Sequence, residues 1–289
     1  MSLLRMRDVL AGYSDEIRQQ IYFDNRLAIF RGNADTLRLI VRQQPPFTFD
    51  DHRLGIILRG EATTILNLVK KHLTAGMIIY IGPGSIINPV SISPDFELCG
   101  LGIPTDFPFP SALPQCFNGQ VRDFQLAADD AARTFARSIL DILWDMVHQE
   151  SYDLPTASYL VSAQMHHYDA LYRQHADIIR QSRSREQTIF DRFLQLVNQH
   201  AVKEHRIAYY ASKMCLTERY LGTVVRQAGG VTAKEWIDRA LIARIKVELR
   251  HTDKSVAQIS EETNFPNPSF FSKYFKRLTQ MTPAEYRAT

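Results

Sequence analysis

The stretches TERYLGTVVRQ, residues 217–227, and NPSFFSKYFKR, residues 267–277, repeat one pattern at an offset of fifty residues. Thr217 and Asn267 are residue types that cap helix N-termini. Pro268 takes the first helical position of the second copy, where its missing N–H costs nothing. Both stretches are therefore predicted to be short helices with defined starts.

Apolar residues follow helical spacing in both stretches. At about 100° per residue they share one side of each predicted helix, and they are Leu221, Val224 and Val225 in the first and Phe271, Phe275 and Leu278 in the second. The opposite sides carry Arg219, Thr223 and Arg226 in the first helix and Ser269, Lys273 and Lys276 in the second. A surface helix ordinarily has a polar face. These two faces carry cations and hydrogen-bonding groups but no carboxylate, although Glu218 lies near the edge of the first. Such faces favour a more specific interpretation, namely that both helices bind in the major groove of DNA.

Each of these helices follows a shorter predicted one across a tight connection, at residues 206–213 and 255–263, which is helix-turn-helix geometry. Capping boxes mark four more helix starts, at Ser184, Thr232, Ser255 and Thr282. Between the two units a predicted helix at residues 233–250 repeats apolar residues at helical spacing, namely Trp236, Ile237, Ala240, Leu241, Ile245 and Leu249. Its length of about 26 Å, with the width of the packed units, separates the two reading helices by a distance comparable with one turn of B-DNA, about 34 Å. One monomer is then expected to touch two successive major grooves.

These residues resemble the AraC/XylS family of bacterial transcription regulators, whose DNA-binding domain has two helix-turn-helix units joined by a long helix. The C-terminal signature of the family is similar to FPNPSFFSKYFKRLTQMTPAEYR, residues 265–287, and its first unit to YYASKMCLTERYLGTVVRQAGG, residues 209–230. Asn264 stands where the family usually has Gly, and Thr263 where it usually has Leu. Asn is the best non-glycine residue for a positive φ. The DNA-binding residues that the resemblance and the helical phase predict are Thr217, Arg219, Gly222, Thr223, Arg226, Asn267, Ser269, Phe270, Lys273 and Lys276.

Length and charge predict two domains. Residues 186–289 carry 16 Lys and Arg against 11 Asp and Glu, whereas the preceding residues carry 18 against 20. Such asymmetry is expected when only one domain binds a polyanion. We expect a front domain at residues 1–180, a polar linker at 181–186 and an AraC-type DNA-binding domain at 187–289.

The front domain is predicted to be an all-β barrel at about residues 25–125, followed by two helices at 127–148 and 156–180. Its apolar runs are LRLIV, RLGIIL, TTILNLV, MIIYI and FELCGLGI, separated by Pro, Gly and Asp. The stretch KKHLTAGMIIYIGPGSI, residues 70–86, resembles the cupin-like sensor domain at the front of many AraC-family proteins. The predicted fold class is therefore α+β, with a cupin-like β-barrel, appended helices and an all-α domain with two helix-turn-helix units.

The alternative function is a cupin-type enzyme that its C-terminal domain tethers to nucleic acid. Metal-binding cupins converge several His and a Glu on one ion, whereas His52 stands alone here and Ile87 occupies the place of the last cupin His. His166 and His167 are adjacent on a predicted helix and cannot converge. No catalytic residue, metal or cofactor is assigned, and Cys99, Cys116 and Cys215 are expected to pack as buried hydrophobes.

A barrel without metal ligands offers an apolar cavity for a small effector. The candidate effector-binding residues are Ile56, Leu58, Ile65, Leu68 and Tyr80, each of which also fits an ordinary core position. Expected stripes on the following helices are Phe135, Ile139, Ile142, Leu143, Met146 and Val147, then Leu160, Met165, Tyr168, Leu171, Tyr172 and Ile178. These helices either cover the barrel or, as the resemblance implies, form a homodimer.

The expected partners are double-stranded DNA, a second copy of the chain, a small-molecule effector and RNA polymerase. Activation is the expected class of regulation, although the residues fit repression equally well. No apolar run approaches the roughly 18 residues of a membrane span, and MSLLRMRDVLAGYSDE, residues 1–16, lacks the apolar core of a secretion signal. A cytoplasmic protein is expected.

Overall fold

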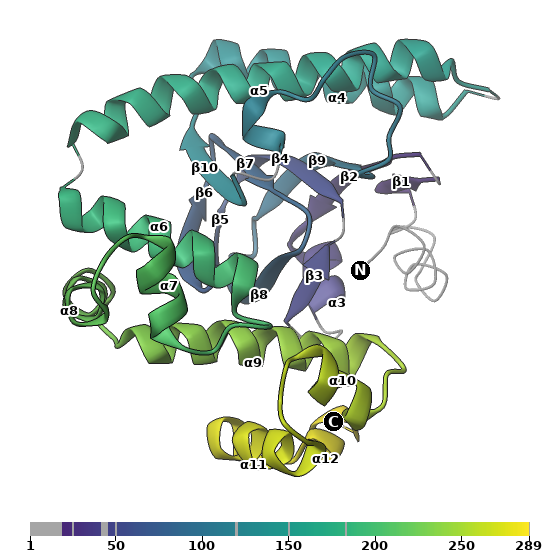
Figure 1. Ribbon diagram of the computed structural model, residues 1–289. Coiled ribbons are helices and arrows are strands. Elements are labelled where there is room, and N and C mark those ends of the chain that lie inside the picture. Colours follow the sequence, from purple (N-terminus) through teal and green to yellow (C-terminus); the bar gives the residue numbers. More distant parts are fainter. Residues whose placement is uncertain are drawn as a thin grey trace. The chain divides into compact units, whose positions relative to one another are not determined.

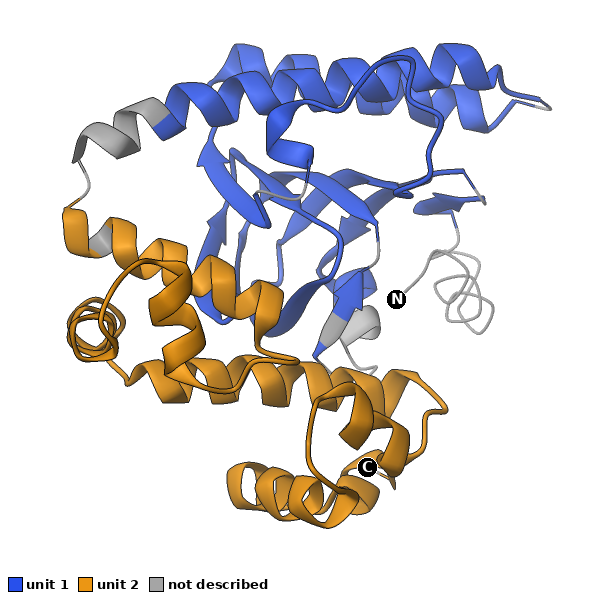
Figure 2. Ribbon diagram, in the orientation of Figure 1, with its two compact units in different colours: residues 1–180 blue, residues 181–289 orange. Residues whose placement is uncertain are grey.

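The computed structural model describes residues 19–24, 26–41, 46–49, 51–118, 121–149, 151–182 and 184–288. The chain divides into two compact units, residues 1–180 (unit 1) and 181–289 (unit 2), as Figure 2 shows. The predicted linker at residues 181–186 overlaps the ends of helices α5 (Leu154–Ser182) and α6 (Arg185–His200). Residues 1–16, on which the expectation about a secretion signal rests, lie outside the described residues. In the described segments we find no helix that is long and apolar enough to cross a bilayer.

Unit 1 is built on two antiparallel sheets (Figure 1). The six-stranded sheet has the order β1 (Ile21–Phe23), β2 (Ala28–Asn33), β9 (Glu97–Ile103), β4 (His52–Arg59), β7 (Met77–Ile81) and β10 (Asp123–Ala127). The four-stranded sheet has the order β3 (Phe47–Phe49), β8 (Ser85–Ile92), β5 (Glu61–Leu66) and β6 (Val69–Thr74). Helices α4 (Asp130–Val147) and α5 follow the last strand.

The prediction of a closed barrel is wrong, because the ladder does not continue around a single sheet. The chain leaves β4 at Gly60, whose φ is 67°, and enters β5 in the other sheet. Glycine takes this backbone conformation without strain, and the sharp turn lets consecutive strands join different sheets. The α+β class and the N-terminal β domain are confirmed, while the resemblance to cupins stays a prediction.

The two faces of the six-stranded sheet have different neighbours. Because successive side chains in a strand alternate, Leu54 and Ile56 of β4 join the core cluster beneath α4 and α5, whereas Ile57 joins a smaller cluster with the four-stranded sheet. The buried Tyr168 of α5 donates a hydrogen bond to the Gly55 carbonyl at 3.0 Å, which ties the helical layer to β4. Unit 1 therefore has three layers: helices, a large sheet and a small sheet.

Two of the predicted strands are wrong. LRLIV lies in helix α3 (Ala34–Val41), which the Asn33 side chain caps by accepting from the Thr36 N–H at 2.9 Å. TTILNLV is a hairpin that turns at Asn67 and Leu68, where φ is 48° and 76°. Strands β4, β7 and β9 lie where RLGIIL, MIIYI and FELCGLGI predict them.

The helical stripes of unit 1 are also only partly correct. Ile139, Leu143 and Val147 of α4 are buried as predicted, but Phe135 and Ile142 are 48% and 50% exposed. In α5, Met165 and Tyr168 are fully buried and Leu160, Leu171 and Tyr172 pack against the same core. The predicted Ile178 has a side chain that lies outside the described residues.

Unit 2 is helical in its described residues. After α6 come α7 (Ile207–Lys213), α8 (Glu218–Gly229), α9 (Ala233–His251), α10 (Val256–Glu262), α11 (Pro268–Thr279) and α12 (Pro283–Ala288). All six residues predicted for the stripe of α9 are buried. Helix α9 packs with α6, α8, α10 and α12, and its residues from Leu241 to Leu249 share a core cluster with Phe271 and Phe275 of α11. The predicted arrangement of two units on one long helix, about 28 Å in length, is confirmed.

Candidate nucleic-acid interface

Helix α8 begins at the predicted cap. The Thr217 side chain accepts from the Tyr220 N–H at 3.2 Å, and Gly230 ends the helix with φ 74°. On its inner face Leu221, Val224 and Val225 are at most 2% exposed. This packing fixes the rotation of α8, so the opposite face must lie outward.

Helix α11 has the same construction. The Asn267 side chain accepts from the Phe270 N–H at 2.8 Å, and Pro268 takes the first helical position. Phe271 and Phe275 are fully buried, but Leu278, predicted for the same face, is 40% exposed. The inner face is therefore shorter than predicted, because Leu278 lies near the C-terminal end of the helix, beyond the core that α9, α10 and α12 provide.

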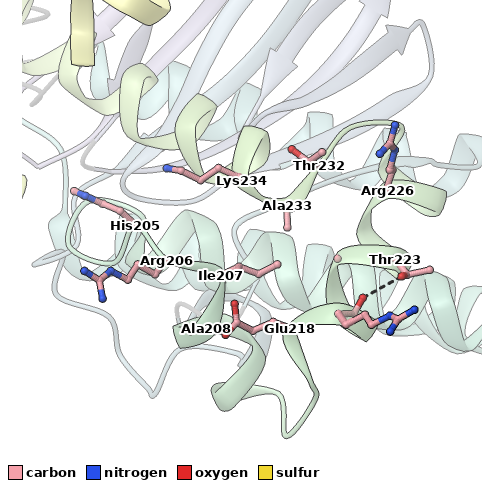
Figure 3. Close-up of a pocket in the computed structure, with 12 residues that line it drawn as sticks. His205, Arg206, Ile207, Ala208, Glu218, Thr223, Arg226, Thr232, Ala233 and Lys234 are labelled. Carbon is pink, nitrogen blue, oxygen red and sulfur yellow. Dashed lines mark hydrogen bonds between the residues drawn. The ribbon is translucent and has the colours of Figure 1, made fainter. Parts of the chain in front are cut away.

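Nine of the ten predicted DNA-binding residues are exposed: Thr217, Arg219, Thr223, Arg226, Asn267, Ser269, Phe270, Lys273 and Lys276. The tenth, Gly222, is half-buried, and a Cβ there would meet only the Ile207 side chain at an ordinary contact of 3.8 Å. The Thr223 hydroxyl donates to the Arg219 carbonyl at 3.0 Å, the bond drawn in Figure 3. Thr223 therefore presents its methyl group and an acceptor oxygen to the outside.

A concavity of about 820 Å³ lies beside α8 (Figure 3). Besides residues of α8, its walls include Arg206 and Ile207 at the start of α7 and Ala233 and Lys234 at the start of α9. Arg206 and Lys234 were not predicted from the sequence, although their positions at the starts of the two neighbouring helices are a signal that could have found them. With Arg219 and Arg226 they place four cations around the concavity, whose lining also includes Glu218.

The two outward-facing helices do not run parallel. Figure 1 looks along the axis of α8, whereas α11 lies across the same view. Successive major grooves of a straight duplex are related by a shift along its axis, so two helices docked identically would be parallel. This arrangement requires a bent duplex or different docking angles for the two helices.

Unit 1 has a cavity of its own, of about 210 Å³, between its two sheets. Its lining is mostly apolar, with Phe30, Ala62, Ile79 and Leu98 among its residues. Arg53 also lines it, ion-paired to Asp51 at 2.9 Å.

Two further polar groups of this lining are the Thr64 hydroxyl and the side-chain amide oxygen of Gln125. Both are buried and have no hydrogen-bond partner among the described residues. The cavity therefore combines apolar walls with a few polar groups, as small-molecule sites do.

None of the five predicted effector-binding residues lines this cavity. Ile56 and Tyr80 are buried in the core beneath α4 and α5, and Leu58 packs against that core. Leu68 lies in the turn after β5, and Ile65 is in β5 itself. The alternation along β4 and β7 was predicted, but it does not tell which face of the sheet meets the helices.

The isolated His52 is a core residue with a polar partner. Its Nδ1 lies 3.0 Å from the Tyr80 hydroxyl, and burial lowers the pKa of the His52 imidazole. The described residues contain no group of three or more His, Cys, Asp and Glu arranged to hold a metal ion. Cys99 and Cys116 are buried as predicted, whereas Cys215 is exposed in the turn before α8, with φ 54°.

Comparison with known proteins agrees with this geometry. A family model described as a helix-turn-helix domain matches residues 210–289. The arabinose operon regulatory protein of Salmonella typhimurium is 30% identical over 95 residues, which cover 32% of this chain and 34% of that protein. The HTH-type transcriptional activator RhaR of Escherichia coli K12 is 22% identical over 248 residues, or 83% of this chain and 86% of RhaR.

Solved structures are more distant. The structure of unsaturated fatty acid bound ToxT from Vibrio cholerae matches 91% of this chain and 95% of the ToxT chain, at 15% identity. Its TM-score of 0.39 is too low to establish a shared overall fold. The chain spans about a third of the length of two curated relatives, the arabinose protein and the regulatory protein PocR of Salmonella typhimurium. The C-terminal unit contains a helix-turn-helix domain, and the chain is similar to transcription regulators that include the arabinose operon regulatory protein and RhaR.

Proposed function

We propose that this chain binds double-stranded DNA sequence-specifically through α8 and α11 and thereby regulates transcription in the cytoplasm. The observation that carries the proposal is that two capped helices of one compact unit bury their apolar faces and expose cationic faces. Arg219, Thr223 and Ser269 are proposed to contact base edges. A guanidinium group that makes two hydrogen bonds, and a hydroxyl group that makes one, can discriminate between bases there. Arg226 and Lys276, farther along their helices, are proposed to contact phosphates, together with Arg206 and Lys234.

Activation is the class of regulation that we propose. It is supported by the similarity to RhaR, named a transcriptional activator, which extends over most of both chains. RNA polymerase is then an expected protein partner. No catalytic role is proposed for any residue.

Unit 1 is proposed to sense a small effector and to form a homodimer. The inter-sheet cavity supports the first role, because the unpartnered Thr64 and Gln125 oxygens would gain hydrogen bonds from a ligand. The exposed Phe135 and Ile142 on α4 support the second, because they lie seven residues apart on one helix face. Thermal-shift measurements across a metabolite panel test the sensing role.

The DNA-binding proposal is tested by replacing one predicted base contact and one predicted phosphate contact. We expect Arg219→Ala to weaken binding by ~1–3 kcal/mol, mostly through one or two base pairs. Lys276→Ala should weaken binding to all sequences alike and reduce the salt slope by about one. The measurement is equilibrium binding to a panel of single-base-pair variants at several salt concentrations.

Arg59→Ala is the matched control, because Arg59 is an exposed cation of unit 1 that pairs with Glu97. It should bind like the unaltered chain. If Arg219→Ala and Lys276→Ala also bound like the unaltered chain, the assignment of the outward faces would be wrong.

A further inference from the structure

The second helix-turn-helix unit contacts the segment between α6 and α7 as well as the shared helix α9. Between α6 and α7, the Lys203 carbonyl accepts a hydrogen bond of 3.0 Å from the Asn264 side-chain amide, in the turn between α10 and α11. Two residues along the same segment, the His205 ring lies 5.1 Å from the Phe265 ring. The segment that leads from α6 into α7 therefore packs directly on the turn of the second helix-turn-helix unit.

A further contact joins α11 to the first half of α9. The half-buried Tyr274 donates a hydrogen bond of 2.6 Å to Asp238, and the Tyr274 ring also lies 5.0 Å from the Phe265 ring. Asp238 is ion-paired with Lys234 at the start of α9, and the Lys234 amine lies 5.7 Å from the centre of the Tyr274 ring. Since Lys234 also lines the concavity beside α8, the network reaches from one reading helix to the surroundings of the other.

Asn264 makes its contact from a backbone conformation that suits glycine. Its φ is 58°, where an L side chain is strained and Asn is tolerated best. Cys215 occupies the corresponding place in the first turn, with φ 54°, but among the described residues its exposed thiol has no hydrogen-bond partner. The two turns thus share a backbone requirement. Only the second turn carries a side chain that bonds to the segment between α6 and α7.

We propose that these contacts, which we call the bracket (Lys203, His205, Asn264, Phe265, Tyr274 and Asp238), hold α8 and α11 at one separation and orientation. Asn264 and Tyr274 are positioning residues that set which operator spacing the protein accepts. A helix alone bends and twists under load, whereas a second connection beside α9 restrains both motions. This inference rests on the proposed DNA-binding function and adds to it the source of spacing discrimination.

The test compares Asn264→Gly with Cys215→Gly in the full chain. Both variants place glycine at a positive φ in a helix-turn-helix turn, and only the first removes a bracket contact. Binding is measured on an operator selected by the unaltered chain, and on versions with one base pair inserted or deleted between its two halves. Melting temperatures are measured alongside, and Tyr274→Phe provides a second variant that removes only a hydroxyl.

The unaltered chain and Cys215→Gly should bind the altered spacings much more weakly than the selected one. Asn264→Gly and Tyr274→Phe should bind the selected operator nearly as well, but their penalty for altered spacing should fall by up to about tenfold, the equivalent of one lost hydrogen bond. Equal spacing profiles in all four proteins would overturn the bracket. A uniform loss of affinity at every spacing, accompanied by a lower melting temperature, would also overturn it, because it would show a local stabilising role only.

The proposed function fails separately. If the unaltered chain selects no operator, sequence-specific binding is wrong and the bracket falls with it. If it selects an operator with two halves and a spacing preference that Asn264→Gly retains, specific binding stands and the bracket alone is wrong.

Discussion

At the scale of single residues, His52 shows how a polar group is accommodated in the core of unit 1. It is 4% exposed, and its ring stacks near the Tyr80 ring while Nδ1 faces the Tyr80 hydroxyl. Burial lowers the pKa of His52, and the neighbouring Asp51 carboxylate opposes this only in part. The folded protein therefore resists protonation of this imidazole more than the unfolded chain does.

This burial predicts a pH dependence of stability. An unfolded His has a pKa of about 6.5, so below that pH the unfolded state binds a proton that the folded state resists. The contribution of His52 to the free energy of unfolding is complete above pH 6.5, and it is lost as the pH falls towards the lowered pKa of the folded state. We measure the free energy of unfolding in urea at pH 7.5 and 5.5. Between these pH values it should fall less in His52→Gln than in the unaltered chain. His166→Gln, which changes an exposed histidine of α5, should retain the original loss, and an unchanged loss in His52→Gln would contradict the argument.

Residue-scale prediction worked best where a local rule acts. The caps Thr217 and Asn267 and the boxes at Thr232, Ser255 and Thr282 all form their expected hydrogen bonds. The box expected at Ser184 involves Gln187, whose side chain lies outside the described residues. Caps are predictable because their partners lie within a few residues. The bracket was not predicted, because Lys203 and Asn264 are 61 residues apart.

At the scale of elements, the outward face of α4 carries two exposed apolar side chains. Phe135 and Ile142 are half exposed, and the Phe135 ring packs only partly, against His167 of α5 at 4.6 Å. Exposed apolar side chains on one helix face are typical of a protein contact. This is why we place the proposed homodimer contact on α4.

The α4 contact predicts a change of oligomeric state. Ile142→Glu puts a charge into the proposed apolar contact, where burial without a partner is costly, so dimerisation should weaken by about tenfold or more. Sedimentation equilibrium measures this directly. Val90→Glu, at another exposed apolar residue of unit 1, should leave the dimer intact. A dimer of undiminished stability in Ile142→Glu would exclude this face.

Elements were predictable where length and caps agree and ambiguous where they do not. The short apolar run LRLIV fits a strand or one side of a helix equally well, and the deciding signal was Asn33 just before it. The stretch TTILNLV gave no signal of a turn, because Leu68 takes a positive φ, which is rare for a branched side chain. By contrast, the 19 residues of α9 repeat their apolar positions over five turns and leave one interpretation.

At the scale of the whole molecule, unit 2 was predicted almost completely and unit 1 only in outline. Helices α8 to α12 of unit 2 each begin at a side-chain cap whose partner lies within a few residues, so their starts can be predicted locally. The sheets of unit 1 depend on long-range pairing, such as β2 with β9 and β4 with β7 and β9. Neither the strand order nor the separation into two sheets can be predicted from any one segment of the sequence.

The account depends on α8 and α11 reading the same duplex. The most direct measurement is selection of bound sequences from a random pool of double-stranded DNA by the full chain. We predict two enriched blocks for each bound monomer, with centres about 10–11 base pairs apart, and repetition of that pair where a dimer binds. Enrichment of one short block only, or of none, would contradict the account.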